Sequence, residues 1–240
     1  MRIFTSYKPF AGRVGEIQAR ARENWKSRFP NAEIADVQGE SGPPDFAQIA
    51  ARASAGEIAL YCNGDILFES GVETVLSNLP DGDFLAVGQR IDWLEDGTRE
   101  RHRPSGMDYF FFRGGMFADL PPTVVGRAYY DSALIAWALR KGVPVIDLTP
   151  VLKVVHQWHD YGHVKDGRKG VFAGTDARAN KANNNLPHFG PHIADAGFMM
   201  TREGKIVPNV RLGRLRRSGR WGLWNVLTRG GRLWNRWWPW

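Results

Sequence analysis

Residues 2–79 alternate short apolar runs with longer amphipathic segments, and this alternation restricts the fold more than any other feature of the sequence. Three apolar runs have the length of strands, at residues 2–7, 32–37 and 57–62. Three segments have the character of helices, at residues 14–29, 46–54 and 70–79. In the first of them, apolar side chains recur every three or four residues, at Val14, Ile17, Ala21 and Trp25. Strands that alternate with helices predict a parallel sheet with crossover helices.

The second half of the sequence is less regular but continues the same fold class. One helix is predicted over residues 130–142, with Asp131 near its start and Gly142 just past its end. Residues 160–200 are rich in Gly, Asn and Asp, which favours loops. Further strand-like segments occur at residues 83–93, 107–117, 143–149 and 151–158. We therefore predict an α/β fold.

The net charge of +7 is concentrated at one end of the chain. Residues 211–240 contain eight arginines and no acidic residue, so residues 1–210 together are close to −1. Six of the ten tryptophans also lie in this segment. We predict a domain over residues 1–208 and a cationic amphipathic tail over residues 209–240. The tail is expected to lie on an anionic membrane surface, although packing of its tryptophans against the domain is the alternative.

Two further features bear on the compartment and the partners. The single cysteine, Cys62, excludes a disulfide within the chain, and no apolar run approaches the ~20 residues of a membrane-spanning helix. We expect a cytoplasmic protein, peripherally associated with the inner face of the membrane. A nearly neutral domain argues against nucleic acid as the partner, because a dedicated binder spreads basic residues over its folded domain.

The strand predicted at residues 57–62 runs directly into Asn63-Gly64-Asp65, after which apolar residues resume. A carboxylate is costly to bury unless it is paired or holds a cation. In open α/β sheets, ligands bind beyond the carboxyl ends of strands. Asp65 therefore either holds a divalent metal, Mn²⁺ or Mg²⁺, beside a bound phosphate, or caps the helix at residues 70–79 or closes a turn.

Three histidines, His156, His159 and His163, are spaced by three and four residues. On a helix this spacing would place three imidazoles on one face and suggest zinc. The β-branched segment that precedes them favours a strand instead, so a three-histidine zinc site is the weaker interpretation.

Several motifs occur in a characteristic order over roughly residues 1–165: "RIFTSYKPF", "LYCNGDILF", "FLAVGQRIDW", "SGMDYFFFRGGMF" and "VVHQWHDYGH". Together they resemble family-2-like glycosyltransferases of bacteria and plants. The resemblance implies a GT-A fold, which is a single Rossmann-like domain with a mixed sheet flanked by helices. It also implies a nucleotide-sugar donor and a divalent metal.

The resemblance also implies roles for particular residues. Asp65 and His156 would bind the metal, and Asp131 would be the general base of an inverting transfer. Asn63 stands where the family has the first acid of an Asp-x-Asp element, and an amide is a poorer metal ligand. The nucleotide sugar would be bound by Thr5, Ser6, Tyr7, Asn63, Gly64, Asp108 and Arg113. For Asp108 a turn-closing role remains open, and for Arg113 that of an exposed arginine at a strand end.

The predicted function is a metal-dependent, inverting transfer of a sugar to a surface glycan or a lipid-linked acceptor. Three alternatives remain open. A nucleotidyltransferase would need a glycine-rich, lysine-bearing loop after the first strand, which "TSYKPFAGR" matches poorly. A non-catalytic GT-A-like domain is left open by Asn63. The Arg/Trp tail leaves open a nucleic-acid-binding protein.

Overall fold

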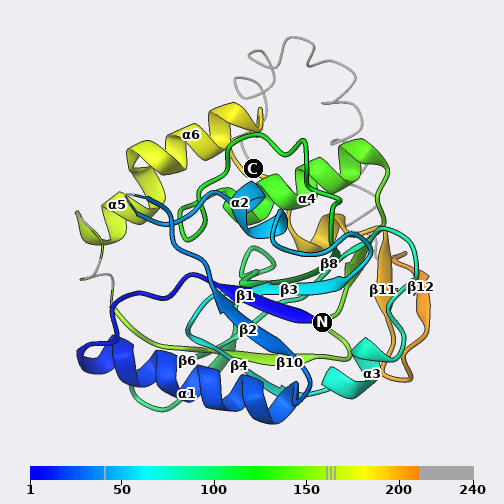
Figure 1. Ribbon diagram of the computed structural model, residues 1–240, viewed down its shortest axis with the longest axis horizontal. Helices are drawn as coiled ribbons and strands as arrows, with labels where there is room; N and C mark the ends of the chain where they lie inside the picture. The colour runs from blue at the N-terminus through cyan, green and yellow to red at the C-terminus, as the bar shows by residue number, and fades with distance from the viewer. Residues whose placement is uncertain (41, 161, 163, 165, 211–240) are drawn as a thin grey trace.

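The fold is known from a computed structural model, which describes residues 1–210 apart from 41, 161, 163 and 165 (Figure 1). The predictions for the tail, except at residues 209 and 210, and for His163 lie outside the described residues. Within the described residues, no helix is long and apolar enough to cross a membrane.

The described residues form an eight-stranded mixed sheet at the centre of the molecule. Its order is β12-β11-β9-β5-β8-β3-β1-β2. β8 and β12 run antiparallel to their neighbours, and the other pairs are parallel. The strands are β1 (Arg2–Thr5), β2 (Glu33–Asp36), β3 (Ile58–Cys62), β5 (Leu85–Val87), β8 (Tyr109–Arg113), β9 (Val145–Asp147), β11 (Phe198–Met200) and β12 (Ile206–Pro208).

A second sheet of four strands has the order β4-β10-β6-β7. β4 (Ile66–Ser70) pairs antiparallel with β10 (Lys153–Gln157), which pairs parallel with β6 (Ile91–Trp93). β7 (Arg99–Arg101) closes a hairpin with β6. Since only three residues separate the end of β3 from the start of β4, the sequence Asn63-Gly64-Asp65 is the link between the two sheets.

The helices lie on both sides of the large sheet (Figure 1). α1 and the small sheet cover one side, whereas α2, α4 and α6 cover the other. The helices are α1 (Gly12–Arg28), α2 (Phe46–Ala50), α3 (Val72–Leu76), α4 (Tyr130–Lys141), α5 (Gly167–Ala173) and α6 (Thr175–Asn183), with a short 3-10 turn η1 at Ile193–Asp195.

The hydrophobic core consists of two main clusters, one on each face of the large sheet, and β8 contributes side chains to both. Its side chains alternate between the faces of the sheet, so Phe110 and Phe112 pack toward α2 and α4 while Tyr109 and Phe111 pack toward α1 and the small sheet. All four are fully buried. A strand whose first four side chains are aromatic is thereby placed at the centre of the sheet, where both faces are covered.

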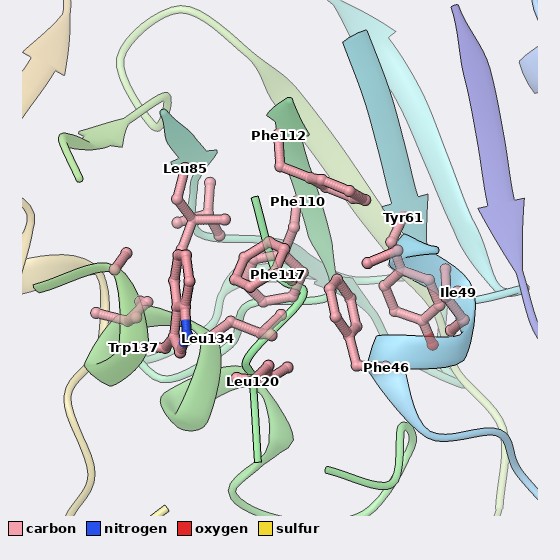
Figure 2. Packing of buried hydrophobic residues seen from close by; sticks show 14 of the residues in the cluster. Phe46, Ile49, Tyr61, Leu85, Phe110, Phe112, Phe117, Leu120, Leu134 and Trp137 are labelled. Atoms are coloured by element: carbon pink, nitrogen blue, oxygen red, sulfur yellow. The ribbon is translucent and has the colours of Figure 1, made fainter. Parts of the chain in front are cut away.

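Aromatic side chains fill the layer between the large sheet and α2 and α4 (Figure 2). The Phe117 ring lies 5.2 Å from that of Phe46 and 4.7 Å from that of Trp137, measured between centroids. Full burial of one such side chain stabilises the fold by about 1.5–3 kcal/mol. This layer therefore holds α2 and α4 firmly against the large sheet.

The α/β architecture, a mixed sheet flanked by helices, confirms the predicted fold class and is consistent with a GT-A-like fold. The prediction of loops over residues 160–200 is wrong in part, because α5, α6 and β11 lie there. α6 is held by Asn180, a fully buried residue whose side-chain amide accepts from Val124 N at 2.8 Å and donates to Val124 O at 2.9 Å. A polar side chain used in this way is not visible as an apolar periodicity.

Candidate active site

A cleft of about 1330 Å³ opens at the carboxyl ends of β1 and β3. Pockets for one small ligand usually measure about 300–1,000 Å³, so this cleft is larger than a typical pocket of that kind. β8 runs antiparallel to β3, so the start of β8 lies at the same end of the strands. The first turn of α4 also lines the cleft. Side chains from all these elements therefore converge on one space.

Asp65, His156 and His159 form a cluster in this cleft, with one potential ligand atom from each residue lying within 4.8 Å of the others. Pairing of β10 with β4 sets His156 opposite Ile66, next to Asp65. His159 lies beyond the end of β10, and its Nε2 is 2.9 Å from Asp65 Oδ2. The corresponding atom of His156 is 3.7 Å from the same oxygen.

The environment of Asp65 fits a divalent metal. The residue is 6% exposed, and its Oδ1 is buried without a hydrogen-bond partner among the described residues. Burial opposes ionisation, but His156, His159 and Lys8 outweigh it and hold the pKa of Asp65 below its ordinary value. An ionised carboxylate beside two imidazoles is a donor set that binds Mn²⁺ or Zn²⁺ more readily than Mg²⁺, which prefers oxygen ligands.

A second carboxylate lies behind His156. Asp92 Oδ1 is 3.6 Å from His156 Nδ1, and Asp92 also contacts Arg90 at 2.8 Å and His102 at 2.5 Å. Burial lowers the pKa of His156, which favours the neutral imidazole that ligates metals. A carboxylate on the far nitrogen orients a ligating histidine, so Asp92 supports the cluster from outside.

The side chain of Asn63 faces a different set of partners from Asp65. Its Nδ2 donates to Asp108 Oδ1 at 2.8 Å, and its Oδ1 accepts from the hydroxyls of Tyr61 and Tyr130, both at 3.2 Å. Asp108 Oδ2 in turn accepts from Arg90 at 2.5 Å. Asn63 and Asp108 thus lie together at the cleft, but Asn63 is outside the metal-ligand cluster.

Asp131 lies in the first turn of α4, half-buried, and lines the cleft. The pKa of Asp131 is raised to about 7, mainly by burial and to a smaller extent by the charge of Asp108, against the opposing hydrogen bond from Ser132 N and the charge of Arg90. A carboxyl group with a pKa near neutrality can take up and release a proton at physiological pH.

The residues expected to hold the nucleoside lie after β1. Ser6 and Tyr7 line the cleft, and Tyr7 N donates to Asp36 Oδ1 at 3.0 Å. Gly64 also lines it, and an added Cβ there would lie 3.1 Å from the Tyr7 ring. Thr5 is fully buried within β1, beside β2, and is not among the residues that line the cleft.

Arg113 lies away from the other residues. It pairs with Ile58 at the start of β3, whereas the cleft is at the end of β3. Its guanidinium donates to Gly56 O at 2.9 Å and to Pro80 O at 2.5 Å. Arg113 is only five residues after Asp108 in the sequence, but β8 lies between them, so Arg113 is at the other end of the strands from the cleft.

The helix-capping interpretation of Asp65 is wrong, because the residue is followed by β4 and the N-cap of α3 is Gly71. His159 was missed as a site residue. The spacing of His156 and His159 pointed to it, but in a continuous strand these side chains would face opposite sides. β10 ends at Gln157, so the constraint of the strand no longer applies at His159.

Comparisons with known proteins identify no family for this chain. No family model matches the sequence, and no curated protein matches it. One solved structure with a similar arrangement is a glycosyltransferase involved in the glycosylation of the major capsid of PBCV-1. It is 12% identical, with a TM-score of 0.32, and the match covers 65% of this chain and 92% of that one. We base no functional argument on this likeness.

Proposed function

We propose that the protein is a metal-dependent glycosyltransferase that moves a sugar, with inversion, from a nucleotide-sugar donor to a hydroxyl group of a glycan or lipid-linked acceptor. One observation carries the proposal. A single cleft combines an Asp-His-His ligand set with a separate carboxyl group whose pKa is about 7. The first suits a diphosphate leaving group, and the second suits a general base.

In this proposal the residues divide the work. A divalent ion held by Asp65, His156 and His159 would neutralise the charge that develops on the departing diphosphate. Asp131 accepts the proton of the acceptor hydroxyl as that oxygen attacks the anomeric carbon. Ser6 and Tyr7 hold the nucleoside. The two imidazoles favour Mn²⁺ over Mg²⁺.

The non-catalytic alternative was raised by the amide at position 63. The contacts of Asn63 weaken this objection, because its side chain is engaged by Asp108, Tyr61 and Tyr130. A metal site made by Asp65 with two histidines does not need a carboxylate at position 63.

The test is a panel of nucleotide sugars titrated calorimetrically with and without Mn²⁺, followed by turnover assays with glycan acceptors. We expect binding of at least one donor to require Mn²⁺. An α-linked donor should yield a β-linked product. Absence of binding to every donor in the panel would contradict the proposal, and an α-linked product would contradict inversion alone.

The cationic tail supports a further part of the proposal, which is attachment to the cytoplasmic face of an anionic membrane where a lipid-linked acceptor is found. The test compares the full chain with a chain ending at Val210. This end point keeps Asn209, which is buried and donates to Gly197 O at 2.9 Å. The full chain should co-sediment with anionic vesicles at low salt and the shortened chain should not. Equal sedimentation would reject the attachment.

A further inference from the structure

Lys8 lines the cleft three residues after β1 ends, on the same side as Asp65. Among the described residues, its ammonium group forms no salt bridge. It is nevertheless close enough to Asp65 and Asp108 for each carboxylate to affect it electrostatically. A lysine side chain is a compact positive charge on a flexible stem, and a lysine in such a position commonly binds an anion.

The main chain of Lys8 is fixed by one side chain. Gln18 lies on the buried face of α1 and is 2% exposed. Its Oε1 accepts from Lys8 N at 2.7 Å, and its Nε2 donates to Lys8 O at 2.9 Å. Removal of a buried partner of this kind leaves polar groups unsatisfied, which destabilises the segment. The direction in which Lys8 leaves the backbone is therefore set by Gln18.

The same glutamine connects Lys8 to the metal-ligand loop. A Cβ added at Gly64 would lie 3.2 Å from Gln18 Oε1, so the segment that precedes Asp65 packs tightly against this amide. Lys8 and Asp65 therefore share one support. An anion bound to a metal at Asp65 would therefore lie close to the ammonium group of Lys8, whose main chain is held in place by Gln18.

A second cation, Arg127, lines the same cleft. Its Nε is 3.5 Å from Asp176 of α6. Burial lowers the pKa of Lys8, Arg127 lowers it further, and Asp65 and Asp108 oppose the change. Two cations that repel each other across a cleft are both stabilised when an anion enters between them.

We propose that Lys8 and Arg127 form a phosphoryl-binding subsite beside the Asp65–His156–His159 cluster, with Gln18 as the positioning residue for Lys8. This inference rests on the proposed function, since the phosphoryl groups would be those of the nucleotide-sugar donor. It adds two cations that neutralise the diphosphate independently of the metal.

The experiment separates anion binding from metal binding. Calorimetry measures the affinity of the full chain first for Mn²⁺ alone, and then for pyrophosphate in a Mn²⁺-saturated solution. Lys8→Met should weaken pyrophosphate binding about 10- to 100-fold, in line with the loss of one charge-assisted contact. The same change should leave Mn²⁺ affinity unchanged or raise it, because a repelling cation is removed.

Two other variants complete the test. Lys26→Met, at an exposed lysine on α1, removes an equal charge far from the cleft and should leave both affinities within about twofold. Gln18→Met should weaken pyrophosphate binding less than Lys8→Met does, because the charge of Lys8 remains in the cleft.

The subsite is rejected if the wild-type protein does not bind pyrophosphate, if Lys8→Met binds it as wild type does, or if that variant loses Mn²⁺ affinity in parallel. If pyrophosphate binding depends on Lys8 but no nucleotide sugar is turned over, the subsite stands and the proposed transferase activity fails.

Discussion

Asp65 and Asp131 line the same cleft, and their carboxyl groups are affected in opposite ways. Burial alone would raise the pKa of both. Asp65 is surrounded by His156, His159 and Lys8, which together hold its pKa below the ordinary value. For Asp131 the effect of burial prevails over the hydrogen bond from Ser132 N and the charge of Arg90, Asp108 adds to the rise, and the pKa reaches about 7. The difference therefore comes from neighbouring charges.

Separate roles follow from this difference. A carboxylate that stays ionised at all physiological pH values suits a cation, whereas one that titrates near neutrality suits proton transfer. Enzymes that need both tasks in one site commonly divide them between two carboxyl groups in contrasting environments. Substitution of either carboxyl group should therefore affect one role and spare the other.

The largest effect is expected for Asp65→Asn. Loss of the only carboxylate in the Asp-His-His cluster should weaken Mn²⁺ binding at least about 100-fold, because even outer-shell changes reach that size. Turnover should fall by roughly 10³, since metal stabilisation of the leaving group is worth several kcal/mol. Calorimetry and initial rates measure the two effects. Normal Mn²⁺ affinity in this variant would remove Asp65 from the metal site.

Asp131→Asn should affect proton transfer and leave metal binding unchanged. The amide keeps the shape of the side chain but accepts no proton, so turnover should fall by about 10²–10⁴. Affinity for Mn²⁺ and for the donor should stay within about twofold of wild type. Wild-type turnover in Asp131→Asn would exclude the residue as the base.

The pH dependence distinguishes the two carboxyl groups without a large change in structure. A base with a pKa of about 7 predicts that the rate falls about tenfold per pH unit below neutrality. The folded pKa of Asp131 is above its unfolded value of 3.8, so its contribution to stability is present at low pH and is lost as pH rises through about 4–7. Asp65 has the opposite sign, and its contribution is lost only as pH falls below about 4.

Melting temperatures at pH 5.5 and pH 8 measure this contrast. Asp131→Asn should be stabilised relative to wild type at pH 8, by about 2–4 °C for each kcal/mol relieved, and about half as much at pH 5.5, which lies midway between the unfolded and folded pKa values of Asp131. Equal differences at the two pH values would show that Asp131 does not titrate in this range.

The smallest effect on the metal is expected for Asn63→Asp, which introduces a carboxylate two residues before Asp65. The side chain faces Asp108 rather than the cluster, so Mn²⁺ affinity should change by less than about threefold. Stability should fall by about 1–3 kcal/mol, because a carboxylate would replace the donor that Asp108 accepts from. Urea unfolding measures the loss. A clear gain in Mn²⁺ affinity would show that position 63 belongs to the metal site.

The sequence allowed much of the first half of the fold to be predicted, because local patterns carry the information there. The strands and helices over residues 2–79 follow the alternation of apolar and amphipathic segments, and Asp65 was recognised as a candidate ligand because it follows a buried strand. The helices over residues 167–183 were missed. α5 has no buried side chain among the described residues, and α6 depends on the polar contacts of Asn180.

The candidate site was harder to predict wherever it depends on strand direction. His156 and Asp65 meet through the pairing of β10 with β4, which involves residues far apart in the chain. Arg113 was expected near the diphosphate, yet the antiparallel course of β8 separates it from Asp108. Lys8 carries no signal of its own, because its role depends on Gln18 and on charges from other elements. Such features are properties of the assembled sheet.

The position of β8 in the sheet has a consequence for the order in which the chain can fold during synthesis. β8 lies between β3 and β5, although β5 precedes it in the sequence. When β1, β2 and β3 have left the ribosome, the free edge of β3 has no partner until roughly 50 more residues have been made, which takes about 3–10 s at usual rates of translation. During that interval the nascent chain exposes an apolar strand edge, which is a site for mispairing with other chains. The central strand of the finished sheet thus creates a period in which the growing protein depends on protection by the ribosome or by chaperones.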